Sequence, residues 1–260
     1  MKSDDTIPAI HNWCDRRCER CVFIERCAVG MVELKRWQKA NPMTDEEVWA
    51  EVSDNFKEAL GMLDKMLREA GLDPEAIASQ PLPLPDPDLE VLEKEIWEKG
   101  MRYFKSVDAF FKSNQEFIHE KGVEVQQRKD MDLPIDFDTL SSLSDALDII
   151  RQYAAFISVK ARRAISGMDN MHDTDAWGDP PHQSDANGSA KITIITIERS
   201  LGAWEILRKN WPEKTDEILD LLIQLSRLRK EIEHLFPDWE KFVRPGFDTE
   251  PPQVRRFEMN

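Results

Sequence analysis

The sequence contains no long hydrophobic segment. Its 260 residues begin Met-Lys-Ser-Asp-Asp, and neither this start nor any later stretch has the apolar run of a signal region or a membrane span. We therefore expect a cytoplasmic protein that does not associate with a membrane. In such a reducing compartment, a compact group of cysteines is more often a metal site than a disulfide framework.

The motifs of several common enzyme classes are also missing. The sequence has no glycine-rich phosphate loop, no Ser-His-Asp order and no nucleophile elbow. No set of polar residues points convincingly to a catalytic pocket, which leaves enzymatic activity open and favours a protein that is not an enzyme.

The chain has fewer basic residues than acidic ones. The chain has 35 Lys and Arg against 50 Asp and Glu, and its formal net charge is −15. Binding of DNA or RNA through a broad positive field is therefore disfavoured. A protein partner or a redox partner is the better expectation.

Cysteine is scarce, and all four cysteines lie within fourteen positions near the start. Cys14, Cys18, Cys21 and Cys27 follow the spacing C-x3-C-x2-C-x5-C. Structural zinc usually takes its ligands as two pairs separated by a dozen or so residues, whereas iron–sulfur loops place their cysteines almost continuously. The spacing favours a [4Fe-4S] cluster held by these four cysteines. Zinc is the alternative, and free or redox-paired thiols are a lesser one.

Two known families have a similar spacing. The first three cysteines resemble the radical-SAM signature, but that family carries its loop on an α/β barrel, and this sequence has almost no strand pattern. Residues 14–27 resemble the C-x6-C-x2-C-x5-C [4Fe-4S] loop of the endonuclease III and adenine-glycosylase family. Cys18-x2-Cys21-x5-Cys27 has that family's last two spacings. Cys14, however, lies closer to Cys18 than the first ligand of that family lies to its second.

The second resemblance implies a fully ligated [4Fe-4S] cluster on Cys14, Cys18, Cys21 and Cys27. It does not imply glycosylase activity, because the chain has neither the helix-hairpin-helix motif nor the lysine–aspartate pair of that family. The rest of the chain resembles no family.

Arginines alternate with the four cysteines, at positions 16, 17, 20 and 26. Cations near the sulfurs would stabilise an anionic cluster. The four arginines could equally be solvated residues that balance the negative charges of Asp15, Glu19 and Glu25. His11 could replace a ligand, although a place beside the site or on the surface suits it better.

The remaining sequence predicts a mainly α protein, a helical bundle of about five helices. Apolar residues recur at helical spacing within residues 31–40, 44–71, 88–126, 138–168, 189–211 and 212–236. A capping box, Thr44 to Glu47, opens the second of these ranges. Residues 191–197 are β-branched and could form a strand, but a lone strand would have nothing to pair with, so we predict a buried helix.

This pattern divides the chain into three parts. Residues 1–42 form a four-cysteine loop with a short helix, residues 43–236 form the bundle, and residues 237–260 form an extended tail. Within the bundle, residues 72–88 are a proline-rich linker and residues 169–187 a long polar loop.

A di-iron carboxylate site is a lesser alternative. Glu116-x2-His119 and Glu231-x2-His234 match the Glu-x-x-His pairs of di-iron bundles, and Glu198 or Glu205 could add a carboxylate. At about 100° per residue, however, both pairs point away from the apolar stripes of their helices, whereas a di-iron site needs its ligands inside.

Overall fold

A computed structural model of the chain describes residues 6–38, 44–79, 86–170 and 180–249. It confirms a mainly α protein, since these residues form eight α-helices and no strand. The helices are α1 (Ala28–Trp37), α2 (Asp45–Glu69), α3 (Pro74–Ala78), α4 (Pro87–Ser113), α5 (Gln115–Asp130), α6 (Phe137–Ser166), α7 (Asp185–Asn210) and α8 (Thr215–Leu235). None of them is both long and apolar enough to cross a membrane.

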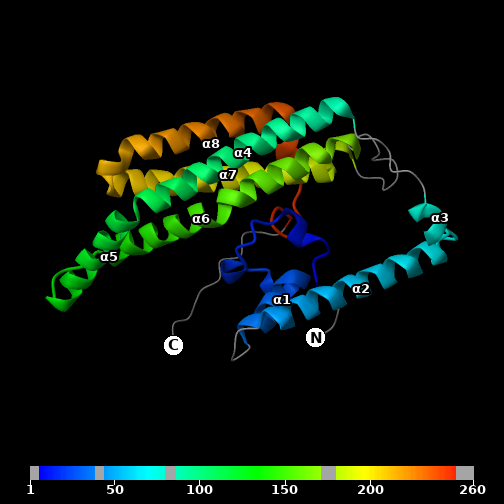
Figure 1. The fold of residues 1–260 in the computed structure, drawn as a ribbon, viewed down its shortest axis with the longest axis horizontal. Coiled ribbons are helices and arrows are strands. Elements are labelled where there is room, and N and C mark those ends of the chain that lie inside the picture. The colour runs from blue at the N-terminus through cyan, green and yellow to red at the C-terminus, as the bar shows by residue number, and fades with distance from the viewer. Residues whose placement is uncertain (1–5, 39–43, 80–85, 171–179, 250–260) are drawn as a thin grey trace.

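Four long helices, α4, α6, α7 and α8, form a bundle (Figure 1). α6 packs against both α4 and α7, and α8 packs against the other sides of α7 and α4. Their facing sides bury one continuous apolar core, which contains Tyr103, Ile150, Tyr153 and Trp204. The bundle therefore contains the main core of the described structure.

α7 is the most deeply buried helix, as the β-branched run predicts. Ile192, Ile194 and Ile197 are fully buried. Polar side chains of the same run are also buried, but their hydroxyls bond within the helix: Thr193 donates to the carbonyl of Ser189 at 2.8 Å and Thr196 to that of Ile192 at 2.9 Å. Local hydrogen bonds thus let this polar run enter the core as a helix.

The long helix predicted over residues 88–126 is in fact two helices. α4 ends at Ser113 and α5 begins at Gln115, with the buried Asn114 between them. The Asn114 side chain donates to the carbonyl of Phe110 at 2.9 Å and to Glu217 Oε2, on α8, at 2.8 Å. An asparagine that bonds to the backbone in this way competes with continuation of the helix.

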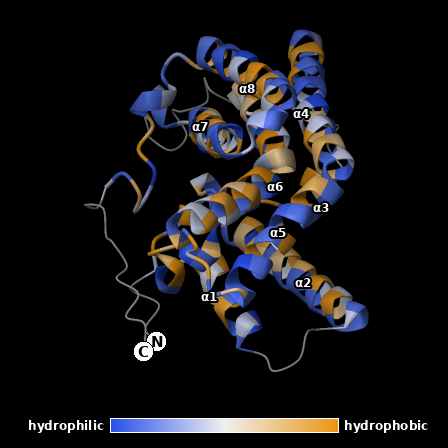
Figure 2. Ribbon diagram, turned by 90° about the vertical axis from the view of Figure 1, so that its left-hand side faces the viewer, coloured by the Kyte–Doolittle hydropathy of each residue, from blue (hydrophilic) through white to orange (hydrophobic). Residues whose placement is uncertain are grey.

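α2 begins at the predicted capping box, with Thr44 and Glu47 bonded reciprocally. Its apolar stripe does not pack into the bundle, however, and no residue of α2 is buried. In both ribbon views α2 runs apart from α7 and α8, and Figure 2 shows apolar residues along its length.

The two predicted loops contain more regular structure than expected. α3 lies inside the proline-rich segment 72–88, of which residues 80–85 are outside the described residues. Of the polar segment 169–187, residues 171–179 are likewise outside. Pro181–Gln183 form a single 3-10 turn, and α7 already begins at Asp185, where the Ser184 hydroxyl caps it.

Candidate metal centre

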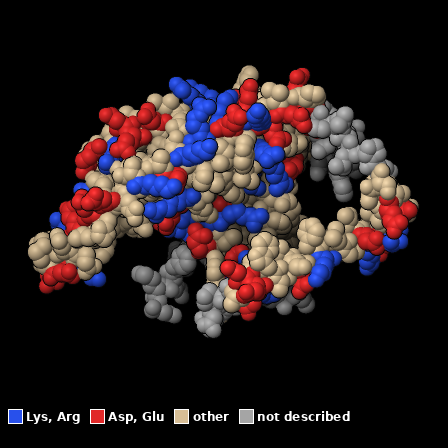
Figure 3. Space-filling view, viewed as in Figure 1, with Lys and Arg blue, Asp and Glu red and all other residues tan. Residues whose placement is uncertain are grey.

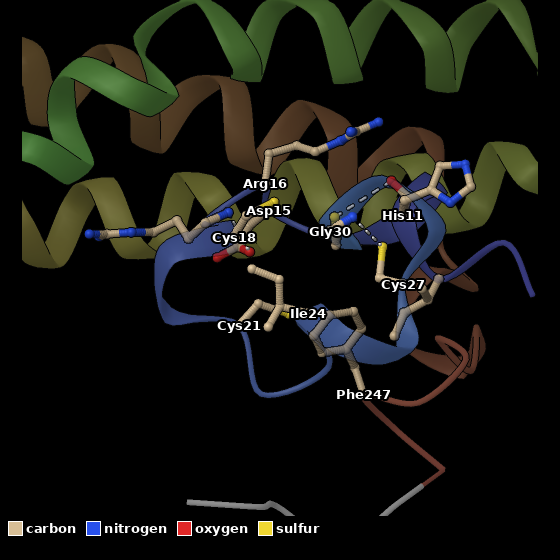
Figure 4. Close-up of a pocket in the computed structure, with 12 residues that line it drawn as sticks. His11, Asp15, Arg16, Cys18, Cys21, Ile24, Cys27, Gly30 and Phe247 are labelled. Carbon is tan, nitrogen blue, oxygen red and sulfur yellow. Dashed lines mark hydrogen bonds between the residues drawn. The ribbon is translucent and has the colours of Figure 1, made fainter. Parts of the chain in front are cut away.

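The four cysteines line one cavity beside the bundle (Figure 4). Asp15, Arg16, Arg17 and Phe247 also border this cavity. Cys14, Cys18 and Cys21 are partly exposed and Cys27 is buried. The structure therefore brings together all four residues that the sequence singles out.

Short turns gather the thiols. The 3-10 turn Ile10–Trp13 directly precedes Cys14, the turn Cys18–Arg20 leads to Cys21, and the turn Ile24–Arg26 leads to Cys27. Arg16 adopts a positive φ of 60°, a conformation that non-glycine residues seldom take, in the segment that joins Cys14 to Cys18. A compact series of turns, rather than a helix or hairpin, thus forms the walls of the cavity.

Cys27 also begins α1. As its N-cap residue, it accepts a hydrogen bond from the Gly30 backbone N–H, with an N–Sγ distance of 3.3 Å. A Cβ atom on Gly30 would lie 2.6 Å from the Ile24 carbonyl oxygen, so only glycine allows this close approach. Hydrogen bonds from backbone N–H groups to the cysteine sulfurs are one of the features that tune a bound iron–sulfur cluster.

The thiols lie close enough to influence one another. Burial, together with the neighbouring Cys14, Cys21 and Cys27, raises the pKa of the Cys18 thiol to about 11. Without a bound cation, Cys18 therefore keeps its proton at neutral pH, and a metal must displace it.

In the part of the chain that the structure describes, no three His, Cys, Asp or Glu side chains are arranged to hold a single metal ion.

The arginines near the cysteines divide by role. Arg16 and Arg17 border the cavity, and Arg17 pairs with Glu19 at 3.0 Å. Arg20 instead bonds to Asp145 of α6, with an Nη1–Oδ2 distance of 2.7 Å. Arg20 thus helps to attach the segment to the bundle.

His11 borders the same cavity, and burial lowers its pKa, so its imidazole is neutral at pH 7. Its backbone carbonyl accepts a hydrogen bond from the Cys14 thiol at 3.5 Å. We expected His11 to stand beside the thiols or on the surface, and the structure places it at the cavity wall.

Bundle residues fix the segment around Cys14 in place. The Tyr153 hydroxyl donates to Asp15 Oδ2 at 2.7 Å, and Arg199 of α7 forms an ion pair with the same carboxylate. The buried Lys160 donates to the Asn12 carbonyl at 2.7 Å, and burial lowers its pKa. These contacts join residues more than 100 positions apart, and nothing in the sequence pattern indicated them.

The described part of the tail covers the other side of the cavity. Phe247 borders the cavity and packs edge-on against Phe23, with ring centroids 5.2 Å apart. Asp248 holds this segment by ion pairs with Arg244 at 2.8 Å and Lys191 at 2.9 Å. Burial alone would raise the pKa of Asp248, but these hydrogen bonds outweigh it and lower the pKa to about 2.

The residues of the di-iron alternative lie elsewhere. Glu116, His119 and His234 are exposed, and Glu231 is engaged by Lys99 of α4. Glu198 pairs with Arg229 at 2.8 Å and Glu205 with Arg208 at 2.7 Å, both at the edge of the core. The described structure thus gives these residues surface roles.

Comparison with known proteins provides no relative: no family model matches the chain, and no curated protein or solved structure matches it significantly.

Proposed function

We propose that the protein is an iron–sulfur protein in which Cys14, Cys18, Cys21 and Cys27 hold a [4Fe-4S] cluster. The observation that carries this proposal is that all four cysteines of the chain line one cavity. Four thiolates are the usual ligand set of such a cluster, and their nearly continuous spacing is typical of cluster loops.

The chain's own residues would stabilise four thiolates. The Gly30 N–H already bonds to the Cys27 sulfur, and Arg16 and Arg17 place positive charge at the cavity wall. Phe247 and Ile24 give the cavity an apolar side, which would limit the access of water. When bound, the cluster would supply one-electron transfer, and these surroundings are what would set its potential.

The structure also supports a structural role. Apart from the main core, the cysteine segment has only a small apolar cluster of its own, centred on Ile10, Phe23 and Cys27. A segment with so little core gains much of its stability from a bound metal. Zinc would meet this need equally well, which makes a zinc-stapled adaptor or binding module the second candidate.

Anaerobic purification followed by absorbance spectroscopy and analysis of iron, sulfide and zinc tests the proposal. We expect a broad band near 400 nm and about four iron and four sulfide per chain. One zinc per chain in a colourless protein would overturn the cluster and support the zinc-stapled module.

Two further measurements define the role and the ligands. A reversible optical change on addition of dithionite would show a redox centre rather than a purely structural one. Each single Cys→Ser variant should lose the bound metal or bind it weakly, whereas His11→Ala should retain it, because four thiolates already complete the ligand set. Loss of the metal in His11→Ala alone would contradict the assigned ligands.

A further inference from the structure

α2 presents an apolar face that no other described part of the chain covers. None of its 25 residues is buried, and the side chains of Trp49 and Phe56 are 72% and 67% exposed. Helices in water gain most of their stability from packing an apolar face against a partner, and a large exposed apolar surface marks an interaction site. Figure 3 shows uncharged side chains between the charged ones along this segment.

The apolar face of α2 follows the heptad spacing of a coiled coil. Its members are alternately three and four residues apart, as at the a and d positions of a heptad. They are Trp49, Val52, Phe56, Ala59, Leu63 and Met66. Val48, Leu60 and Met62 are exposed beside this seam and widen it.

We propose that this seam pairs with the α2 seam of a second copy of the chain, in antiparallel orientation. A two-fold axis between residues 57 and 58 would place Phe56 of each copy against Ala59 of the other. The same register sets Val52 against Leu63 and Trp49 against Met66. A large side chain then meets a small one in the central layers, which is how helix interfaces fill space. A parallel pair would set Phe56 against Phe56 and leave a gap between the two alanines.

The charges of α2 favour the same orientation. Residues 45–55 contain five acidic residues and no basic one, whereas all three basic residues of the helix, Lys57, Lys65 and Arg68, follow later. With the axis between residues 57 and 58, antiparallel pairing sets residues 45–57, which have five acidic residues and one basic residue, against residues 58–69, which have three acidic residues and two basic ones. Parallel pairing would set the two strongly acidic halves together.

The size of the face suits a dimer. Eight apolar side chains of α2 are between 41% and 72% exposed. Together they offer an area on the order of the 800 Å² that a standard interface buries on each partner. A two-fold interface is also the commonest form of self-association. The proposal uses none of the cysteines and is independent of the proposed metal.

Light scattering coupled to size exclusion of the full chain tests the pairing. We expect twice the mass of the chain for the wild type and a single-chain mass for Phe56→Glu. Phe137→Glu is the matched control, because Phe137 is also 72% exposed but lies at the start of α6, and it should remain a dimer. A wild type of single-chain mass, or a Phe56→Glu variant that stays dimeric, would overturn the proposal.

Photo-crosslinking tests the orientation. Trp49 is replaced by p-benzoylphenylalanine, and the crosslinked peptide is identified by mass spectrometry. We expect a bond to the peptide containing Met66, which lies about 25 Å from position 49 within one helix and so must belong to the second copy. Crosslinks to the region around position 49 of the second copy, to another protein, or to the chain's own bundle would each overturn the antiparallel pair.

Discussion

The hydroxyl of Tyr153, in the middle of α6, donates a 2.7 Å hydrogen bond to Asp15, the residue next to Cys14. Arg199 of α7 binds both partners, since it pairs with the Asp15 carboxylate and donates to the Tyr153 oxygen at 3.2 Å. One wall of the four-cysteine cavity is therefore held by two helices of the bundle. The geometry of the proposed metal centre depends on this attachment.

Tyr153→Phe should loosen the cysteine segment without disturbing the bundle. It removes one hydrogen bond and leaves a partly buried carboxylate with less support, at a cost of about 1–3 kcal/mol. If that cost falls on the attachment of the segment, a chelator should remove bound metal roughly tenfold faster, because 1.4 kcal/mol corresponds to a factor of ten. Stopped-flow mixing with a chelator, monitored by absorbance or with a metal indicator, measures the rate of metal loss.

Tyr103→Phe is the matched control for this change. Tyr103 is the other buried tyrosine, and its oxygen accepts a 2.9 Å hydrogen bond from Trp204 inside the bundle core. This variant should lower the stability of the bundle and leave the rate of metal loss unchanged. Equal rates of metal loss in the two variants would contradict the special role of Tyr153.

Gly188→Ala should move the segments around Trp13 and Phe242 away from α7. A Cβ atom at this position would lie 2.4 Å from Trp13 Nε1 and 2.6 Å from Phe242 Cζ, so both rings would have to move. Overpacking of this kind costs about 1–3 kcal/mol of unfolding free energy. Urea unfolding followed by tryptophan fluorescence measures the loss.

Gly202→Ala, on the same helix, should act in the opposite direction. Apart from its chain neighbours and the backbone of its own helix, no atom lies within 4 Å of the Cβ that it would add. Alanine in a helix interior is more stable than glycine by about 0.5–1 kcal/mol, so this variant should be slightly more stable than the wild type. A similar loss of stability in both variants would show that close packing at Gly188 is not the cause.

The sequence predicted the helices well where the signal is local to the helix. The β-branched run in α7 and the capping box at Thr44 are both local features, and both are observed. The grouping of the four cysteines is also local, because turns within fourteen residues suffice to bring them to one cavity.

Features that depend on distant residues could not be predicted in this way. The Asn114 side chain at the helix break is also held by Glu217 of α8, and the cavity walls require Tyr153 and Phe247. The stripe of α2 shows that one face favours burial, but a stripe does not say what covers it. The amphipathic pattern therefore predicted the α2 helix correctly, but the prediction that this helix packs within the bundle was wrong.

Asp248→Asn should destabilise the tail in a pH-dependent way. The pKa of Asp248 in the folded protein is about 2, below its ordinary value of 3.8, so the charged form stabilises the fold. This contribution is fully present above pH 4 and is lost as the pH falls towards 2. The difference in unfolding free energy between the metal-free wild type and the variant should therefore be largest at pH 7 and shrink steadily below pH 4.

The half-exposed Asp238 provides the control for Asp248. It pairs with Lys241 at 2.7 Å on the surface of the same segment. Exposed pairs contribute little, so Asp238→Asn should change the unfolding free energy by less than about 1 kcal/mol at any pH. If its effect matched that of Asp248→Asn, general acid unfolding would explain the result better than the Asp248 ion pairs.

Removal of the proposed metal should release the cysteine segment and leave the bundle intact. The core of the bundle contains no cysteine, whereas Cys27 is one of the few buried residues of the segment's own apolar cluster. Chelation should therefore leave the far-ultraviolet circular dichroism nearly unchanged and make the chain sensitive to trypsin at Arg16, Arg17 and Arg20. The variant with all four cysteines changed to serine should give the same fragments without a chelator. If chelation instead abolished most of the helical signal, the metal would be supporting the entire fold, and the bundle would not be the independent body that its core indicates.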